Sequence, residues 1–290
     1  MKADLVADLA LLMIDRLQRC CSAEPGRRPV LALQAPVGAG KTTLAKQLQA
    51  RADSLGLRLA VSSIDDAYHG WAERQRRLAG NPFGVNRVPP GSHDPDLLLA
   101  AITAWRAGGP LVLPRFDKTL RQGQGDRSGW QRWNGADALL LEGWLVGYEP
   151  VGPIGVSRWL ADHPDDLNPA EQAWLPRWDR ALAAYQPLWL CCDSFWMMQP
   201  ERCSSVLRWR LQAEARQRRF AGQALPTQDV LALVRASQAS LPAGLYGPGL
   251  SARAMAIARL DGRRRCQQLT LAQSVESTSA HSSPSSSLIG

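Results

Sequence analysis

Short apolar runs recur along the chain, separated by longer segments in which apolar residues follow a helical spacing. The pattern predicts strands at 30–34, 57–64, 111–113, 138–141 and 188–192, and helices at 1–20, 40–55, 96–106, 170–184 and 207–220. Strands that alternate with helices indicate a mostly parallel sheet with right-handed crossovers. The expected fold class is therefore α/β, a doubly wound and mostly parallel sheet flanked by helices.

The chain is expected to divide into three parts: residues 1–28 as an amphipathic helix and linker, 29–266 as the α/β domain, and 267–290 as a disordered, Ser-rich tail. Acidic residues interrupt the apolar stretches of the N-terminus, which argues against a secretory or transit peptide. No segment is long and apolar enough to span a bilayer, so we expect a soluble protein with no membrane partner. Two long polar segments, 80–94 and 118–135, are expected to be loops that contact substrate.

The net charge of +8 at pH 7 is carried mainly by arginine. The arginines are scattered and no nucleic-acid-binding motif is present, so we expect a protein that handles anionic nucleotides and acids, with no nucleic-acid partner. The six cysteines include two adjacent pairs and no C-x-x-C motif, which indicates neither a disulfide framework nor a zinc site. They suit a reducing, cytoplasmic compartment. No feature of the sequence indicates an oligomeric state.

A phosphate-binding loop follows the first expected strand and opens a helix. Residues 35–43 read APVGAGKTT, the Walker A pattern G-x-x-x-x-G-K-[ST] with Ala35 at the first glycine position. Glycines bring backbone N–H groups close to phosphate oxygens, and the N-terminus of the helix favours the same anion. Lys41 is expected to reach the β- and γ-phosphates, and the Thr42 hydroxyl to bind Mg²⁺. The residues expected to bind ATP are Gly38, Ala39, Gly40, Lys41, Thr42 and Thr43.

Acidic residues stand where two expected strands end. Asp65 and Asp66 follow the second strand, and Glu142 follows the apolar run at 138–141. Ligands of doubly wound sheets bind beyond the carboxyl ends of strands, and a kinase needs one carboxylate near the acceptor hydroxyl and another near Mg²⁺. A helix N-cap without chemical function is the alternative for either aspartate. The sequence does not decide between Asp65 and Asp66.

Several segments are similar to known kinases. Residues 35–43, 63–68 (SIDDAY) and 141–144 (LEGW) resemble the P-loop kinases that include uridine kinase, phosphoribulokinase and pantothenate kinase. Six further segments look like plant-type D-glycerate 3-kinases: 90–94 (PGSHD), 114–118 (PRFDK), 125–127 (GDR), 142–147 (EGWLVG), 209–214 (WRLQAE) and 241–246 (LPAGLY). The resemblance covers roughly residues 29–265, and segments in this order are more specific than a Walker A motif alone.

The resemblance implies a P-loop NTPase fold with a lid segment and transfer of the γ-phosphate of ATP to the 3-hydroxyl of D-glycerate, with Mg²⁺. In plants and cyanobacteria this activity closes the photorespiratory carbon cycle. By position, Asp65 matches the aspartate taken as general base, and Glu142 matches the acid associated with the metal. Ala67 stands where an aromatic residue is usual.

A small anionic acceptor calls for arginine or lysine at its carboxylate. We expect Arg115 to bind it with help from Lys118 or Arg127, although surface ion pairs would also explain these side chains. Asp66 and His93 are further candidates for substrate contacts, with a loop-stabilising role as the alternative for His93. In the helix at 207–220, Arg216 or Arg218 is expected to stabilise the transferring phosphate from the lid; a solvated face is the alternative.

Two other readings stay open. A uridine kinase-like or pantothenate kinase-like enzyme would keep the chemistry with another acceptor. An ATP-dependent switch or assembly factor would hydrolyse ATP slowly without any acceptor, but it leaves Asp65 and the segment 115–118 unexplained.

Overall fold

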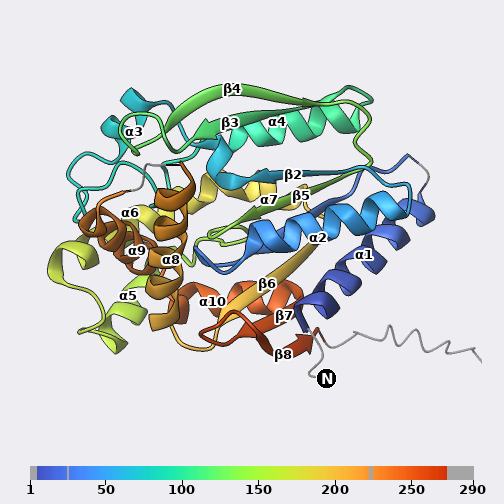
Figure 1. Cartoon of the computed structure of the whole chain (residues 1–290). Coiled ribbons are helices and arrows are strands. Elements are labelled where there is room, and N and C mark those ends of the chain that lie inside the picture. The colour runs from blue at the N-terminus through green and yellow to red at the C-terminus, as the bar shows by residue number, and fades with distance from the viewer. Residues whose placement is uncertain (1–4, 25, 222–224, 273–290) are drawn as a thin grey trace, which may run out of the picture.

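The computed structural model describes residues 5–24, 26–221 and 225–272 (Figure 1). The helices are α1 (Leu5–Ala23), α2 (Lys41–Ser54), α3 (Trp71–Arg77), α4 (Pro95–Arg106), α5 (Gly152–Asp162), α6 (Pro169–Leu182), α7 (Gln186–Leu190), α8 (Ser204–Ala221), α9 (Thr227–Ser240) and α10 (Ala243–Arg253), with 3₁₀ turns η1 (Ile64–Ala67) and η2 (Ala183–Tyr185). The strands are β1 (Val30–Gln34), β2 (Leu59–Ser63), β3 (Leu111–Asp117), β4 (Asp126–Trp133), β5 (Ala138–Gly143), β6 (Ser194–Pro200), β7 (Ala254–Leu260) and β8 (Cys266–Leu271).

A six-stranded sheet in the order β2-β5-β1-β6-β7-β8 forms the centre of the fold. Its strands are parallel except for β8, which is antiparallel to β7. All five residues of β1 are buried, as expected for a strand covered on both faces. The predicted α/β class with a mostly parallel sheet is confirmed.

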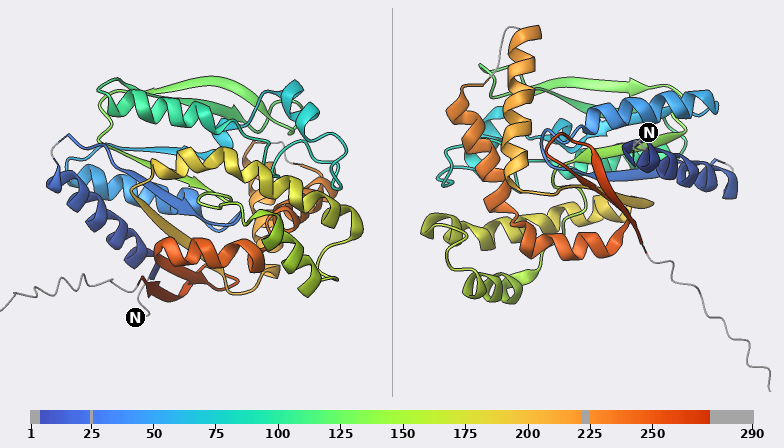
Figure 2. Two further views of the ribbon diagram at one scale, coloured as in Figure 1. Left: turned by 180° about the vertical axis from the view of Figure 1, so that it is seen from behind. Right: turned by 60° about the horizontal axis from the view of Figure 1, so that its bottom comes forward.

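Helices cover both faces of this sheet. In Figure 1, α1 and α2 lie in front of the sheet, and Figure 2, turned by 180°, shows α4, α6, α7 and α10 on the opposite face. Leu9, Met13 and Leu17 of α1 are fully buried in one apolar cluster with residues of α2. The other cluster holds most of the large aromatic side chains, including Trp105 and Trp189. Their indole N–H groups donate to the backbone oxygens of Ala136 and Tyr148, so burial leaves neither unpaired.

Two predictions about the elements were wrong, and one predicted strand is present but lies in another sheet. Residues 188–192 are not a strand: α7 ends at Leu190, and the strand that pairs with β1 is β6, starting at Ser194. The strand predicted at 111–113 does not join the central sheet, because β3 pairs with β4 in a separate two-stranded sheet. Residues 126–133, predicted as part of a loop, form β4.

The end of the domain also differs from the prediction. Strand β8 continues to Leu271, so the sheet extends beyond the boundary predicted at residue 266. The remainder of the predicted Ser-rich tail, from residue 273, lies outside the described residues. Within the described part of the chain, no helix is long and apolar enough to cross a membrane.

His69 gives the fold a pH dependence. Burial lowers the pKa of His69 to about 4; Arg77 acts in the same direction, and Asp94 opposes it. Because histidine in an unfolded chain titrates near 6.5, the unfolded state binds more protons, and stability is lost as pH falls from about 6.5 to about 4. We expect His69→Gln to reduce the difference in unfolding free energy between pH 7 and pH 4.5 by about 2 kcal/mol. Denaturant unfolding at both pH values measures it, and parallel pH profiles for the two proteins would contradict it.

Candidate active site

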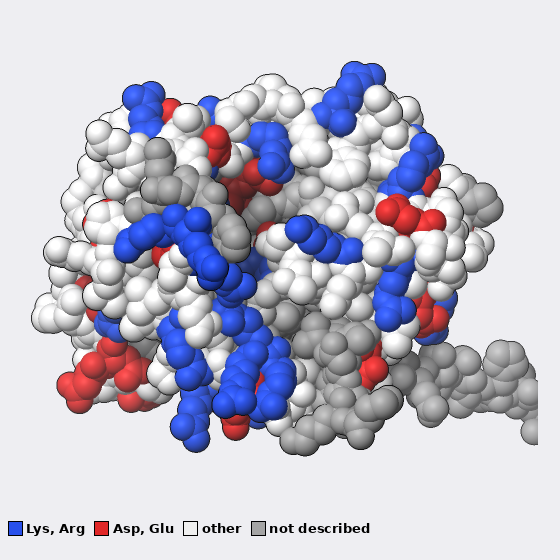
Figure 3. All heavy atoms as spheres, viewed as in Figure 1, with Lys and Arg blue, Asp and Glu red and all other residues white. Residues whose placement is uncertain are grey.

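A cavity of about 460 Å³ opens at the carboxyl ends of β1, β2 and β5, beneath α8 and α9. Figure 3 shows Lys and Arg side chains gathered around a hollow on this face, with acidic atoms inside it. The lining residues are Val37, Gly38, Gly40, Lys41, Thr42, Thr43, Ser63, Asp65, Tyr68, Arg87, Val88, Lys118, Glu142, Gly143, Trp144, Arg210, Ala213, Arg216, Leu233, Val234 and Arg264. Parallel strands therefore bring the phosphate loop and two of the three strand-end acids to one place.

The phosphate loop has the backbone that its sequence requires. Gly38 and Gly40 have φ of 80° and 103°, in the left-handed region that disfavours side chains. A Cβ on Gly38 would lie 2.8 Å from the backbone carbon of Trp209, so this glycine also lets α8 approach the loop. Lys41 Nζ donates to the carbonyl oxygens of Ala35 and Pro36 at 3.2 and 3.3 Å. The ammonium is thus held inside the loop, where it can meet a phosphate.

Five of the six residues predicted to bind ATP line the cavity: Gly38, Gly40, Lys41, Thr42 and Thr43. Ala39 does not line it. Its side chain is buried in the apolar cluster beneath α1 and α2, and its N–H donates to the oxygen of Pro36. Its place in the loop is therefore structural.

Asp65 lies at the carboxyl end of β2, in the 3₁₀ turn η1, with its carboxylate in the cavity. Lys118 Nζ donates to one carboxylate oxygen at 2.7 Å, and His93 Nε2 lies 3.7 Å from the other. Burial alone would raise the pKa of Asp65, but Lys118 and His93 together hold it well below its usual range. Asp65 is therefore an ionised carboxylate that can accept a hydrogen bond from an acceptor hydroxyl.

His93 supports Asp65 from behind. Its side chain is fully buried and does not line the cavity. The Tyr185 hydroxyl accepts from the Gly91 N–H at 3.2 Å and lies 2.9 Å from His93 Nδ1. When the Tyr185 hydroxyl donates its hydrogen bond to Nδ1, the imidazole carries its own proton on Nε2, which faces Asp65. This tautomer is inferred from the hydrogen-bond pattern.

Asp66 has a different environment. Its carboxylate accepts from the backbone N–H groups of Ser63 and Phe116, both at 3.2 Å, and closes a capping box around η1. Burial raises the pKa of Asp66, with Arg115 acting against it. Asp66 does not line the cavity. The geometry therefore separates the two aspartates that the sequence left open: Asp65 faces the cavity, and Asp66 fastens the turn.

Glu142 closes the cavity at the end of β5. Burial raises the pKa of its carboxyl, and Lys41, whose Nζ is 3.8 Å away, acts in the opposite direction. The oxygen facing Lys41 is buried and has no hydrogen-bond partner among the described residues. A buried carboxylate oxygen without a hydrogen bond, in the cavity that Thr42 also lines, fits Mg²⁺, which takes one or two protein oxygens together with phosphates and water.

The predicted arginines divide into two groups. Arg216 of α8 lines the cavity, whereas Arg218, on the same helix, is exposed and donates to the oxygen of Leu225. Arg115 is 47% exposed and lies 3.6 Å from Asp66, outside the lining. Arg127 donates to the oxygen of Tyr68 and to Asp94, also outside it. Only Lys118 and Arg216 of these candidates reach the cavity.

Several lining residues were not predicted from the sequence, chiefly Tyr68, Arg87, Arg210 and Arg264. Arg87 is 4% exposed and comes from the segment 80–94. This segment was predicted to contact substrate, but His93 was its only named candidate. Arg210 lies one helical turn before Glu214, with which it forms an ion pair. Arg264 follows β7 and donates to the oxygen of Gly38 at 2.6 Å. No signal in the sequence distinguished Arg264 from its basic neighbours.

This fold and this phosphate loop are those of a P-loop nucleotide-binding protein, and the chain is similar to kinases. The chain is 28% identical over 216 residues to an uncharacterized kinase of Schizosaccharomyces pombe. This alignment covers 70% of this chain and 77% of that protein. It is 29% identical over 237 residues to the chloroplastic D-glycerate 3-kinase of Arabidopsis thaliana, covering 77% of this chain and 49% of the plant enzyme. The chain thus spans about half the length of the plant relative.

The structure is also similar to that of a D-glycerate 3-kinase from Cryptococcus neoformans, with a TM-score of 0.80 at 24% sequence identity. The alignment covers 93% of this chain and 99% of the fungal one. No family model matches the chain. The chain is homologous to D-glycerate 3-kinase, and its fold is that of the P-loop kinases.

Proposed function

We propose that the protein transfers the γ-phosphoryl group of ATP to the 3-hydroxyl of D-glycerate and releases ADP and 3-phosphoglycerate. The observation that carries the proposal is the meeting of Lys41, Asp65 and Glu142 in one cavity beside the phosphate loop. An ATPase switch has no need for an ionised carboxylate held by Lys118 in the cavity of the phosphate loop. The choice of D-glycerate rests on the names of the Arabidopsis and Cryptococcus relatives.

In the reaction, the 3-hydroxyl oxygen of D-glycerate forms a bond to the γ-phosphorus while the bond from that phosphorus to the β–γ bridging oxygen breaks. ADP leaves with the electron pair, and the hydroxyl proton passes to Asp65. Because the pKa of Asp65 is low, the proton moves only as the new bond makes the hydroxyl acidic. Until then Asp65 orients the hydroxyl. Lys41 and Arg216, which line the cavity, would stabilise charge on the phosphate oxygens.

Mg²⁺ would be held by Thr42 and Glu142, and when bound it would offset phosphate charge. The basic side chains of α8 lie over the same cavity, which suits the predicted lid.

Arg87 is our candidate for binding the glycerate carboxylate, in place of Arg115. It is buried, lines the cavity with Lys118, and donates to the oxygen of Gln124 at 3.4 Å. A hydrogen bond to a charged group contributes about 1.5–3 kcal/mol. We therefore expect Arg87→Met to raise the KM for D-glycerate by about 10- to 100-fold, with a small change in the KM for ATP. Steady-state kinetics measures both constants.

Arg115→Met is the matched control and should change the KM for D-glycerate by less than about threefold, because a half-exposed ion pair contributes little. Equal effects of the two substitutions would return the role to Arg115.

The proposed function is tested by ADP release from the purified protein with Mg-ATP, with and without D-glycerate, and with uridine and pantothenate as other acceptors. We expect D-glycerate alone to stimulate release. Stimulation by uridine or pantothenate instead would keep the chemistry and change the acceptor. Slow release that no acceptor stimulates would favour the switch. The proposal includes a place in photorespiration and a cytoplasmic location.

A further inference from the structure

The turn between β7 and β8 joins the phosphate loop to α8. Arg264, in this turn, donates from Nε to the carbonyl oxygen of Gly38 at 2.6 Å. Its Nη1 donates to Gln212 Oε1 at 2.9 Å, and its Nη2 donates to the carbonyl oxygen of Trp209 at 3.2 Å. One guanidinium therefore connects three segments that lie far apart in the sequence: the loop, the helix above it and the turn at the end of the sheet.

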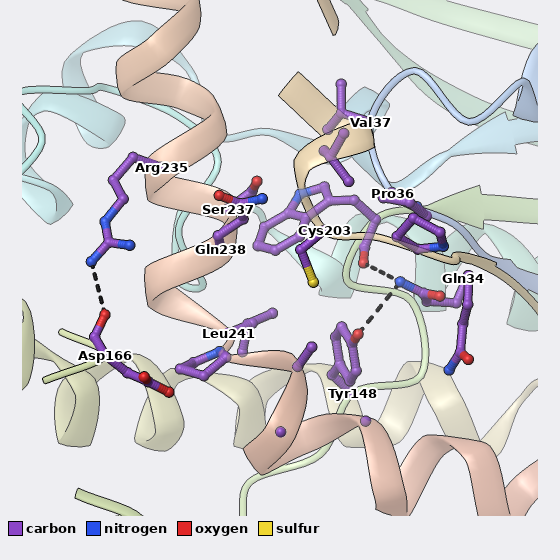
Figure 4. Close-up of a pocket in the computed structure, with 18 of the residues that line it drawn as sticks. Gln34, Pro36, Val37, Tyr148, Asp166, Cys203, Arg235, Ser237, Gln238 and Leu241 are labelled. Carbon is purple, nitrogen blue, oxygen red and sulfur yellow. Dashed lines mark hydrogen bonds between the residues drawn. The ribbon is translucent and has the colours of Figure 1, made fainter. Parts of the chain in front are cut away.

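The phosphate loop lies between two cavities. The second cavity, of about 580 Å³, is lined by Pro36 and Val37 of the loop (Figure 4). Val37 also lines the cavity of the candidate active site, so this part of the loop is a wall between the two. Atoms that face a cavity lose packing contacts on that side, so the shape of the loop depends on its hydrogen bonds. At its start, Gln34 donates to the oxygen of Trp144 at 2.9 Å, a contact drawn in Figure 4.

Two hydrogen bonds fix the peptide group between Gly38 and Ala39. Its carbonyl oxygen accepts from Arg264, and its N–H donates to the oxygen of Pro36 at 3.2 Å. Gly38 and Gly40 are conformationally permissive, so the loop sequence does not fix this peptide by itself. The bond from Arg264 therefore helps to hold the loop in one shape for phosphate oxygens.

The same turn also holds α8. The oxygen of Gly262 accepts from Trp209 Nε1 at 3.0 Å. Trp209 is fully buried, and a Cβ on Gly38 would lie 2.8 Å from its backbone carbon, so helix and loop meet where Arg264 bridges them. Arg216 lines the cavity about two helical turns further along α8. Contacts at Trp209 therefore help to set where α8 holds Arg216.

The backbone of Arg264 is strained. Its φ is 65°, in the left-handed region that disfavours residues other than glycine, and such residues persist where their surroundings over-determine them. The Asp261 carboxylate accepts from the N–H groups of Arg263 and Arg265 at 2.7 and 2.9 Å, which holds the turn independently of the Arg264 side chain. Glycine would fit this position without strain, so the side chain of Arg264 carries a conformational cost that its three bonds offset.

We propose that Arg264 is a positioning residue of the active site: through Gly38 it holds the phosphate loop in the shape that binds the phosphates of ATP, and through Trp209 it keeps α8 in place over the loop. The inference rests on the proposed function only in taking ATP as the ligand of the loop, and it does not depend on the acceptor. Because Arg264 also lines the cavity, direct contact of its charge with the nucleotide is the competing role.

The test is calorimetric titration of Mg-ADP and of a Mg-bound, non-hydrolysable ATP analogue, without acceptor, into the wild type and Arg264→Gly. Glycine suits the φ of 65°, so the variant is expected to fold. We expect the Kd of both nucleotides to rise by about 10-fold or more, and by similar factors, because the loop holds phosphates that both share. The KM for D-glycerate should change by less than about threefold, whereas a general loss of structure would weaken both substrates.

Two further variants separate position from charge. Arg264→Lys keeps the charge but lacks the planar fork that three fixed acceptors require, so its Kd values should stay at least about fivefold above those of the wild type. Should Arg264→Gly not fold, this variant decides. Arg263→Gly is the matched control: it removes the same charge from an exposed neighbour outside the cavity lining, and should change either Kd by less than about twofold.

Wild-type affinity in Arg264→Gly would overturn the inference and leave the proposed function intact. So would wild-type affinity in Arg264→Lys, which would assign the effect to charge. A loss confined to the ATP analogue would also overturn it, because that is the mark of direct contact with the γ-phosphate. If the wild type bound neither nucleotide, the proposed function itself would fall, and this inference with it.

Discussion

Replacing Asp65 with asparagine is expected to lower kcat for D-glycerate phosphorylation by about 10³-fold, within the range that general bases contribute. Asparagine keeps the size of the side chain and its contact with Lys118, but it cannot hold the hydroxyl proton or attract it by charge. The KM for ATP should change little, because the phosphate loop is untouched. Steady-state ADP release with saturating substrates measures kcat.

Asp66→Asn is the control, because Asp66 is adjacent in sequence and bonded to the backbone outside the cavity. It should lower stability and leave kcat within about fivefold of the wild type. A kcat for Asp65→Asn within the same fivefold range, or a larger loss in Asp66→Asn, would show that Asp65 is not the base.

The positions of the buried strands could be predicted because a strand buried on both faces is a continuous apolar run in the sequence. β1 and β5 are built on short apolar runs, as expected for strands covered on both faces. The same signal failed at Leu188–Leu190, an apolar run that forms α7. A short apolar run cannot be assigned to helix or strand by periodicity. Pro187, in the first turn of α7, favours the helix, and Leu190 is 86% exposed.

Strand β4 had no such signal. Its side chains are exposed or half-buried along its whole length, because β3 and β4 form a ribbon apart from the central sheet. β4 is ordered by its pairing with β3, and local composition does not predict pairing between separate segments.

For the site, the sequence identified residues whose position follows from the fold. Lys41, Asp65 and Glu142 stand at strand ends or in the phosphate loop, and parallel strands carry their ends to one edge. Arg87 and Arg264 come from a loop and from the turn after β7, and their approach to the cavity depends on tertiary packing. The contrast between Asp65 and Asp66 likewise depends on which carboxylate meets the N–H of Phe116, 50 residues away.

Replacing Lys41 with methionine is expected to lower kcat by about 10³-fold or more, the loss typical of a donor that stabilises charge in the transition state. Lys41 is the only lysine of the phosphate loop, and its side chain is 14% exposed, with Nζ held by the oxygens of Ala35 and Pro36 and near Glu142. Methionine preserves the length of the side chain, so the loop keeps its packing and loses the charge. Single-turnover ADP formation with excess enzyme separates this loss from weaker ATP binding.

Lys46→Met supplies the control, because Lys46 lies on α2 with an exposed side chain and does not line the cavity. It removes the same charge from the same helix, so long-range electrostatics alone should change kcat by less than about twofold. The removal of Lys41 should also raise the pKa of Glu142 further, since Lys41 opposes the effect of burial there. Activity remaining in Lys41→Met should therefore fall at a higher pH than in the wild type as the solution is acidified, and an unshifted acid limb would show that Glu142 does not act through this pair.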